Sequence, residues 1–294
     1  MDAGGTTIDA ACVAADGDVI GGLRESDSPA SGTKDEIVNE FARVIAAARA
    51  RAGAAARAAA AEVVACGIAI PAPFDYAAGV SHMTHKFRAI NGVHLGRLLQ
   101  AATGWPAYFV NDADAFGLGV SWRQLPDTKR FVALTIGTGL GASFIEDGVN
   151  LQGGNGVPPG GELWDLPYGD GILEDHVSGR AVVASYAGFG GAGPRSAKEI
   201  GDLALRGDPA AVEAYRAMGA ALGRGLAPVL TRFAPEKIVI GGHIARSLEL
   251  FLPAMEQALS AAGLPAPPII ASAPGNMAIW GAARYALARG PAAG

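Results

Sequence analysis

Short apolar runs alternate with longer amphipathic stretches along almost the whole chain. The apolar runs have the length of buried strands, and flanking glycine and proline residues bound several of them. We predict strands at residues 8–14, 63–70, 107–110, 131–136, 237–240 and 269–271. Strands that alternate with helical stretches are typical of an α/β protein whose sheets are covered by helices on both faces.

Capping sequences show where several helices begin. Residues 33–36 (Thr-Lys-Asp-Glu) and 196–199 (Ser-Ala-Lys-Glu) are capping boxes, and the first opens a helix through Arg51. Asp208 precedes a proline, an arrangement that favours a helix start, and the helix is expected to run towards Phe233. The final stretch, residues 276–289, is apolar at helical spacing and predicts a last helix.

Two glycine–threonine turns occupy comparable places in the two halves of the chain. The first comprises Asp2, Gly4, Gly5, Thr6 and Thr7, and the second contains Gly137, Thr138, Gly139 and Gly141. A turn that approaches a phosphate closely has no room for a Cβ, and its N–H groups must face the anion. The pair predicts a phosphate held from two sides, although either turn alone could be an ordinary turn between strands.

The length and the two turns predict two related α/β lobes with a cleft between them. We expect a small first lobe of residues 1–111 and a large second lobe of residues 112–275, with the boundary near 111–113. The C-terminal helix, about 276–294, is expected to return to the first lobe.

Asn111 and Asp112 follow directly after a predicted strand. A carboxylate at the C-terminal end of a strand faces the region where α/β proteins bind ligands, so Asp112 is a candidate base for an alcohol. The alternative is that Asp112 is the N-cap of a helix over residues 113–121, with Asn111 as an ordinary turn residue. Both roles are compatible, because a capping position also fixes the orientation of a carboxylate.

Glu162 and Glu174 lie in glycine-rich segments, where carboxylates can accept hydrogen bonds from vicinal sugar hydroxyls. Glu174 could instead be an acid in the first turn of a helix, stabilised by the helix dipole. His82 and His85 are close in sequence, but no cysteine or carboxylate completes a zinc set, so we predict no zinc site. Lys86 could reach an anionic ligand, and nothing near it in the sequence supports this role.

The composition excludes several classes of protein. Half of the residues are apolar and 17% are charged, which argues against disorder. The net charge of −5 provides no positive electrostatic field that would attract nucleic acid or anionic lipid. No apolar run has the length of a membrane span. Cys12 and Cys66 lie in apolar runs and are expected to be free thiols of a cytoplasmic protein.

In order along the chain, the motifs resemble the ROK sugar kinases of the actin-like ATPase superfamily. The matching segments are residues 2–7 (first phosphate loop), 67–73 (family pattern G-I-G-x-P-G-P), 110–115 (E-N-D-A-N-A), 134–141 (second phosphate loop), 161–162 (start of G-E-x-G-H), 173–179 (L-E-x-x-x-S-G) and 235–242 (P-E-x-I-V-I-G-G). The resemblance implies two actin-like (ribonuclease H-like) lobes with an interlobe cleft.

The resemblance also implies the roles of the site residues. Asp112 would be the general base for a sugar hydroxyl, and Asp2 would orient Mg²⁺ through water. The other sugar-side residues would be Asn111, Glu162, Glu174, Asp165 and Pro71. Both glycine turns would position the triphosphate of ATP, and Gly241 and Gly242 would pass beneath the adenosine. Members of this family also suggest a homodimer.

The sequence departs from the family pattern at three places. Asp165 stands where the family has the histidine of its zinc motif, whose cysteine cluster is also absent. Ala72 replaces the glycine of the sugar-side loop, which would narrow that side of the cleft. Only Met1 precedes Asp2, where the family has a full strand, so we expect a start further upstream and poor nucleotide binding by the chain as given.

The sequence therefore predicts an ATP-dependent sugar kinase that acts on a hexose, at the 6-hydroxyl. One alternative is a non-catalytic sugar sensor of the same family, and the acidic charge disfavours the DNA binding such a regulator needs. Another is an actin-like ATPase with a non-sugar substrate. The sequence does not identify the sugar.

Overall fold

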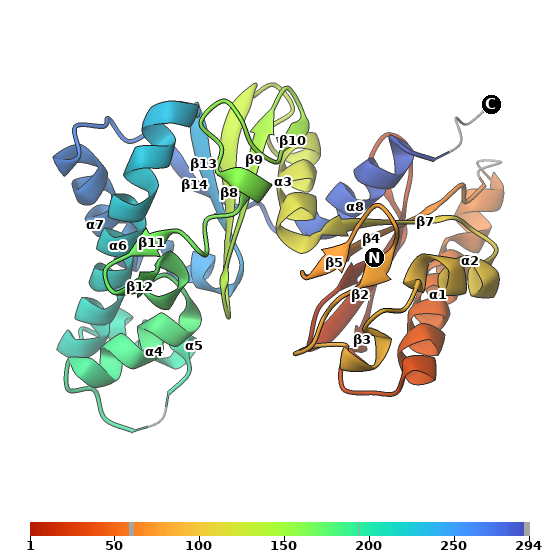
Figure 1. Ribbon diagram of the computed structural model, residues 1–294, viewed down its shortest axis with the longest axis horizontal. Coiled ribbons are helices and arrows are strands. Elements are labelled where there is room, and N and C mark those ends of the chain that lie inside the picture. Colours follow the sequence, from red (N-terminus) through yellow and green to blue (C-terminus); the bar gives the residue numbers. More distant parts are fainter. Residues whose placement is uncertain (59–61, 194, 291–294) are drawn as a thin grey trace. The chain divides into compact units, whose positions relative to one another are not determined.

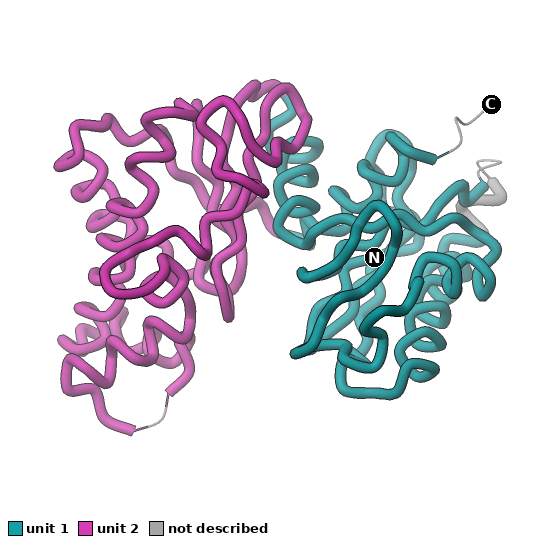
Figure 2. Tube along the Cα trace, in the orientation of Figure 1, with its two compact units in different colours: residues 1–126, 275–294 teal, residues 127–274 magenta. Residues whose placement is uncertain are grey.

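The computed structural model describes residues 1–58, 62–193 and 195–290 of the 294-residue chain. The chain forms two compact units, one of residues 1–126 with 275–294 and one of residues 127–274 (Figure 2). The units divide at Asp127, later than the expected 111–113, because helix α3 packs against helix α8 within the first unit. Residues 291–294, expected within the last helix, lie outside the described residues.

The first unit is built on a five-stranded sheet in the order β3-β2-β1-β4-β7 (Figure 1). Strands β1 (Asp2–Ala3), β2 (Thr7–Val13) and β3 (Val19–Asp27) are antiparallel, while β4 (Cys66–Ile70) and β7 (Ala107–Asn111) run parallel to β1. The remaining elements are α1 (Lys34–Ala58), β5 (Phe74–Asp75), β6 (Val80–Ser81), η1 (Arg88–Ile90), α2 (Leu95–Thr103), α3 (Asp112–Arg123) and α8 (Met277–Leu287).

The second unit repeats this plan, with the strand order β10-β9-β8-β13-β14. Strands β8 (Arg130–Ile136), β9 (Leu140–Glu146) and β10 (Val149–Leu151) are antiparallel, and β13 (Lys237–Gly241) and β14 (Ile269–Ala271) continue the sheet in parallel. Its other elements are η2 (Pro159–Gly161), β11 (Pro167–Tyr168), β12 (Gly171–Ile172), η3 (Leu173–Asp175), α4 (Gly179–Gly188), α5 (Ala197–Leu205), α6 (Pro209–Phe233), η4 (His243–Ser247) and α7 (Leu248–Ala261). The shared order confirms two related α/β lobes.

The expected capping sequences form their hydrogen bonds. The Glu199 N–H donates to Ser196 Oγ over 3.3 Å, and the Ala211 N–H donates to Asp208 Oδ1 over 2.9 Å. Helix α6 ends at Phe233 as expected, whereas α1 continues past Arg51 to Ala58. These local signals place the helix starts well because a cap satisfies donors that have no partner inside the helix.

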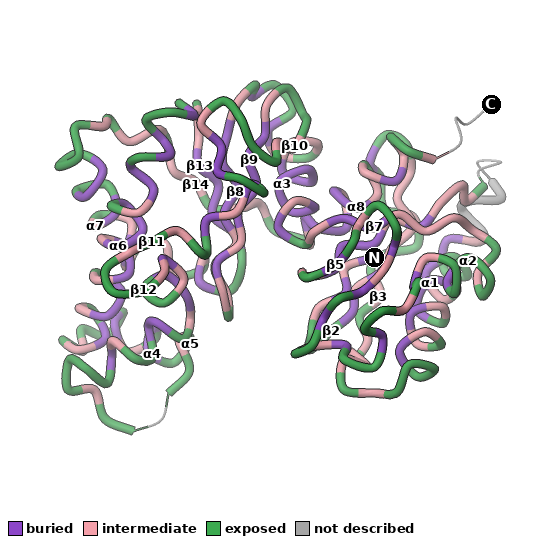
Figure 3. The backbone as a smooth tube through the Cα atoms, in the orientation of Figure 1, coloured by how far each residue is buried: buried purple, intermediate pink, exposed green. Residues whose placement is uncertain are grey.

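Each unit has its own core (Figure 3). In the first unit, Ile68 and Ile70 of β4 belong to a core that includes residues of α1 and α2. Gly67 lies on the other face of the same strand, where a Cβ would stand 3.1 Å from the backbone nitrogen of Ala283 in α8. Since alternate residues of a strand face opposite sides, helices cover both faces of this sheet.

Helices α3 and α8 approach each other through glycines. A Cβ on Gly281 of α8 would stand 2.8 Å from the Cα of Ala115, and one on Gly119 of α3 would stand 2.7 Å from the carbonyl carbon of Met277. Backbone packs on backbone here, so α8 supports the helix that begins at Asp112. None of the helices in the described ranges is long and apolar enough to cross a membrane.

Candidate active site

Strand β7 ends at Asn111 and helix α3 begins at Asp112. The Asn111 Oδ1 accepts from the N–H groups of Ala113 (2.9 Å) and Asp114 (3.3 Å), so Asn111 is the N-cap. The alternative in which Asp112 is the cap and Asn111 an ordinary turn residue is wrong, because Asn111 has the non-helical backbone that a cap requires and Asp112 is already helical. The Asn111 amide nitrogen also donates to the Tyr76 hydroxyl over 3.1 Å. Both the oxygen and the nitrogen of the Asn111 side chain are thus hydrogen-bonded, which fixes the residue preceding Asp112.

Asp112 retains an exposed face while protein atoms crowd its other sides. Loss of hydration raises the pKa of its carboxyl, and the Ala113 N–H and the Lys86 ammonium oppose this increase. A carboxylate with a raised pKa is a stronger proton acceptor than one in water. Asp112 is therefore a chemically suitable base that a substrate can reach.

The first glycine turn joins the antiparallel strands β1 and β2, so its backbone is a hairpin loop. Ser28 fixes it: the Ser28 hydroxyl donates to the Gly4 carbonyl (2.7 Å) and the Ser28 N–H to the Thr6 carbonyl (2.9 Å). Gly5, Thr6 and Thr7 are exposed. Strand β1 has only two residues, yet it lies between β2 and β4 in the sheet. The turn is therefore a hairpin loop, and this conformation is compatible with a role in ligand binding.

A single amide joins two carboxylates behind this turn. The Asn276 Nδ2 donates to Asp2 Oδ2 over 2.9 Å and to Asp9 Oδ2 over 2.8 Å. Asp2 and Asp9 are paired in register on β1 and β2, and Asp9 Oδ1 is buried with no hydrogen-bond partner among the described residues. Burial raises the pKa of Asp2, the Asn276 hydrogen bond lowers it, and the nearby Asp112 carboxylate raises it. Sequence reasoning missed Asn276 because its position predicts only a helix cap, and its side chain makes no cap bond.

The second glycine turn joins β8 and β9. The Gly137 N–H donates to the Gly139 carbonyl (3.0 Å), and the Gly137 carbonyl accepts from the N–H of Gly179 at the start of α4 (2.7 Å). A Cβ on Gly137 would meet nothing within 4 Å, so the space in front of this residue is accessible to a ligand. The turn is therefore held from behind and open in front of Gly137.

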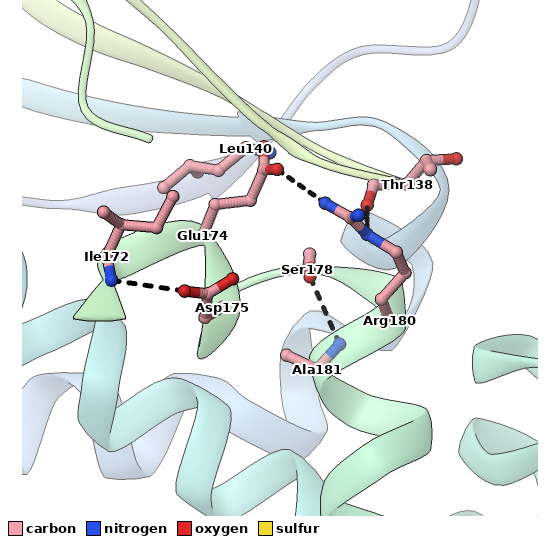
Figure 4. A network of polar contacts seen from close by, with 8 residues as sticks. All are labelled: Thr138, Leu140, Ile172, Glu174, Asp175, Ser178, Arg180 and Ala181. Atoms are coloured by element: carbon pink, nitrogen blue, oxygen red, sulfur yellow. Dashed lines mark hydrogen bonds and ion pairs between the residues drawn. The ribbon is translucent and has the colours of Figure 1, made fainter. Parts of the chain in front are cut away.

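Glu174 lies against this second turn (Figure 4). Its Oε2 accepts from the Leu140 N–H over 2.8 Å, and its Oε1 pairs with the Arg180 guanidinium over 2.6 Å. Arg180 also donates to the Thr138 carbonyl over 3.2 Å. The Glu174 carboxylate leaves no space for a Cβ at Gly139. Both oxygens of Glu174 thus brace the turn, a contact that neither sequence interpretation of Glu174 anticipated, and Arg180 was missed with it.

The remaining site residues of the second unit lie in loops and at strand ends. Glu162 is half-buried and accepts from the Trp164 indole N–H over 2.7 Å, while Asp165 is exposed. Gly242 follows β13 with a φ of 83°, and a Cβ there would stand 2.9 Å from the backbone nitrogen of Ile136. Only glycine fits this approach, which supports the end of β8 just before the second turn. Gly241 is the last residue of β13.

The structure thus brings the site residues together as two groups, one in each unit. Asp2, the first turn, Asn111 and Asp112 belong to the first unit, together with Pro71, which follows β4 and is half-exposed. The second turn, Glu162, Asp165, Glu174 and the Gly241–Gly242 pair belong to the second unit. Within the described part of the chain, no group of three or more histidine, cysteine or acidic residues could hold a metal ion.

A family model described as the ROK family matches residues 1–288, almost the whole chain. The chain belongs to the ROK family. The two-lobed actin-like fold expected from the motifs is confirmed, because ROK sugar kinases are its structural neighbours.

Relatives of this ROK chain include enzymes and a regulator. It is similar to the glucokinase of Thermotoga maritima, with 28% identity over 282 residues that cover 87% of this chain and 85% of the relative. It is similar to the DNA-binding transcriptional repressor Mlc of Escherichia coli, with 26% identity over 217 residues, 68% of this chain and 53% of the repressor. Among solved structures, the ROK hexokinase from Thermus thermophilus superposes with a TM-score of 0.79 at 27% identity, covering 98% of this chain and 97% of that one.

Proposed function

We propose that this ROK protein is an ATP-dependent sugar kinase that phosphorylates a hexose, at its 6-hydroxyl. The observation that carries the proposal is Asp112, an accessible carboxylate with a raised pKa at the end of β7, in the same unit as the first glycine turn. The similarity to a glucokinase and to a ROK hexokinase supports the substrate class.

In the proposed reaction, the sugar hydroxyl oxygen forms a bond to the γ-phosphorus of ATP. The bond from that phosphorus to the β,γ-bridging oxygen breaks, and its electron pair leaves on ADP. The hydroxyl proton passes to the Asp112 carboxylate. Asn111 contributes by fixing the start of α3, since its amide is held by the helix and by Tyr76. Most of the acceleration of phosphoryl transfer comes from such positioning and from charge stabilisation.

The two glycine turns would hold the phosphates, with Thr6, Thr7 and Thr138 as hydroxyl donors. Glu162 is half-buried and Asp165 is exposed, and we assign the sugar hydroxyls to them and to Glu174. Glu174 would share its oxygens between Arg180, the turn and the sugar. The carboxylate of Asp2 is an oxygen ligand of the kind Mg²⁺ prefers, and the ion would neutralise phosphate charge when it is bound with ATP.

A coupled assay of ATP consumption across a panel of hexoses and amino sugars tests the proposal. We expect turnover with at least one hexose, and we expect Asp112→Asn to reduce kcat about 10²–10⁴-fold, because general-base catalysis contributes that much. Asp114→Asn, two positions further into α3, is the matched control. Asp112→Asn activity within a few-fold of the parent would refute the assignment of the base.

A sugar-responsive regulator is the second candidate, and the similarity to Mlc is the observation in its favour. The two functions differ in one measurement. A regulator would bind a hexose in calorimetry and consume no ATP in its presence, whereas a kinase would do both.

A further inference from the structure

Lys86 lies over the first glycine turn. If Gly5 carried a Cβ, the Lys86 Cδ would stand 3.1 Å from it, the Cε 3.2 Å and the Nζ 3.7 Å. The absence of a side chain at Gly5 therefore leaves the room that the lysine stem occupies. A segment far along the sequence, between β6 and η1, thus brings a cation to the turn.

The backbone beside Lys86 is held in an unusual conformation. Phe87 has a φ of 49°, in the left-handed region that bulky residues rarely adopt. Such a conformation persists only where the surroundings impose it. Here the Phe87 ring is fully buried, packs edge-on against Phe41 with 5.6 Å between ring centroids, and its N–H donates to the Ala30 carbonyl over 2.9 Å. These contacts of Phe87 therefore fix the backbone next to Lys86.

The Lys86 ammonium has no hydrogen bond and no ion pair within 4.0 Å to any described residue. It is near enough to Asp112 to lower the pKa of that carboxyl, but the two do not form a salt bridge. Lys86 is half-exposed, so its charge can meet a ligand. A lysine placed only to neutralise Asp112 would pair with it directly, so this geometry leaves the ammonium available to an anion.

We propose that the Lys86 ammonium binds the terminal phosphoryl group of the donor nucleotide, between the first glycine turn and Asp112. This inference rests on the proposed function. Charge accumulates on the phosphoryl oxygens during transfer, and a fixed cation that contacts them stabilises the transition state. A lysine ammonium, with its compact charge and three donors, suits this contact.

The assignment gives Lys86 a second effect, on the base. Asp112 faces Lys86 from the segment before η1 and Asp2 from β1, with Asp9 of β2 behind Asp2 and Asp114 on its own helix. The Met1 ammonium interacts with Asp2 and Asp9, whereas Lys86 is the cation that lowers the pKa of Asp112, so its removal takes this effect away from the base. The pKa of Asp112 should then rise, and the acidic limb of the kcat profile should move to higher pH.

The test compares Lys86→Met and Lys86→Arg with Arg88→Met, a control that removes an exposed cation from the same segment. We expect Lys86→Met to lower kcat/KM for ATP about 10²-fold, as the loss of one donor to developing charge does. The KM for sugar should stay within about 3-fold, Lys86→Arg should recover part of the loss, and Arg88→Met should match the parent. Should Lys86→Met fail to fold by circular dichroism, Lys86→Gln replaces it.

Binding of AMPPNP, measured by calorimetry, separates this inference from the proposed function. If no sugar is phosphorylated but Lys86→Met weakens AMPPNP binding about tenfold and Arg88→Met does not, the function fails and the phosphoryl contact stands. If the parent is active and Lys86→Met retains its kcat/KM for ATP and its acidic limb, the contact is refuted while the kinase stands. No AMPPNP binding by the parent would also overturn the inference.

Discussion

The contact between α3 and α8 allows a substitution far from any ligand to test how Asp112 is supported. In Gly281→Ala, the new Cβ would stand 2.8 Å from the Cα of Ala115, whereas ordinary contacts of this kind begin at 3.4 Å. It would be closer still to the Ala115 carbonyl group. Because the obstruction is backbone, no side chain can rotate away, and the two helices must move apart by roughly 1 Å.

The magnitude follows from two opposing effects. Overpacking costs typically about 1–3 kcal/mol, and the rigid backbone on both sides favours the upper value. Alanine gains about 1 kcal/mol over glycine within a helix, which leaves a net loss of about 2 kcal/mol. For a unit of this size, each kcal/mol lowers Tm by about 2–4 °C, so we expect a decrease of about 4–8 °C. Displacing the helix that begins at Asp112 should also lower kcat about 10–100-fold, because a misplacement of about 1 Å can cost 10²-fold.

Differential scanning calorimetry and the coupled kinase assay measure both effects. Gly188→Ala is the matched control, since a Cβ at Gly188, the last residue of α4, meets nothing within 4 Å. We expect its kcat to match that of the parent and its Tm to be equal to that of the parent or higher by at most about 2–4 °C, because the new Cβ meets no atom and alanine gains up to about 1 kcal/mol over glycine in a helix. A Gly281→Ala protein as stable as the parent would show that the two helices are not in the close contact described here. A lower Tm with unchanged kcat would show that α8 does not position the base.

Further predictions concern Asp112, Asn276 and Cys66. Loss of hydration raises the pKa of Asp112 above its ordinary value of 3.8, so the folded protein binds this proton more tightly than the unfolded chain. The protein therefore loses stability as the pH rises from 3.8 through the raised pKa. Asp112→Asn should therefore have a higher Tm than the parent at pH 7, and the difference should vanish below about pH 3.8; a lower Tm at pH 7 would contradict the sign. Asn276→Ala removes the donor to the carboxylates of Asp2 and Asp9, which should raise the pKa of Asp2 further. The KM for ATP should then increase most strongly at acidic pH. A KM that is unchanged at every pH would show that Asp2 does not depend on this amide. Burial raises the pKa of Cys66 to about 11, so iodoacetamide at pH 8 should leave it unmodified until the protein is unfolded, as read by mass spectrometry.

The sequence was sufficient to predict the elements whose signals are local. The six predicted strands and the helix starts at Ser196 and Asp208 depend on neighbours a few residues away, and each corresponds to an element of the structure. The buried strand β9 (Leu140–Glu146) was not predicted. Strand β3 (Val19–Asp27) was missed because it lies at a sheet edge and is mostly exposed, so it has no apolar run.

The contacts that complete the candidate site could not be predicted in this way. Asn276 reaches Asp2 from the far end of the chain, and nothing in its own neighbourhood distinguishes it from a helix cap. The sequence around Lys86 gives no support for an anion-binding role, because its spatial neighbours Gly5 and Asp112 approach it only in the folded protein. The residue types of a site can be recognised locally, but the side chains that tune them come from other elements.

The discontinuity of the first unit has a consequence for how the protein is made. Residues 127–274 form one uninterrupted unit and can fold as soon as they leave the ribosome, whereas the first unit needs α8, which is synthesised near the end. Until α8 emerges, α3 lacks the helix against which Gly119 packs, and Asp2 and Asp9 lack the amide of Asn276. The proposed base and the acid of the first turn are thus completed together by the last helix, so a nascent chain released before that point would carry every residue of the first turn and no supported site.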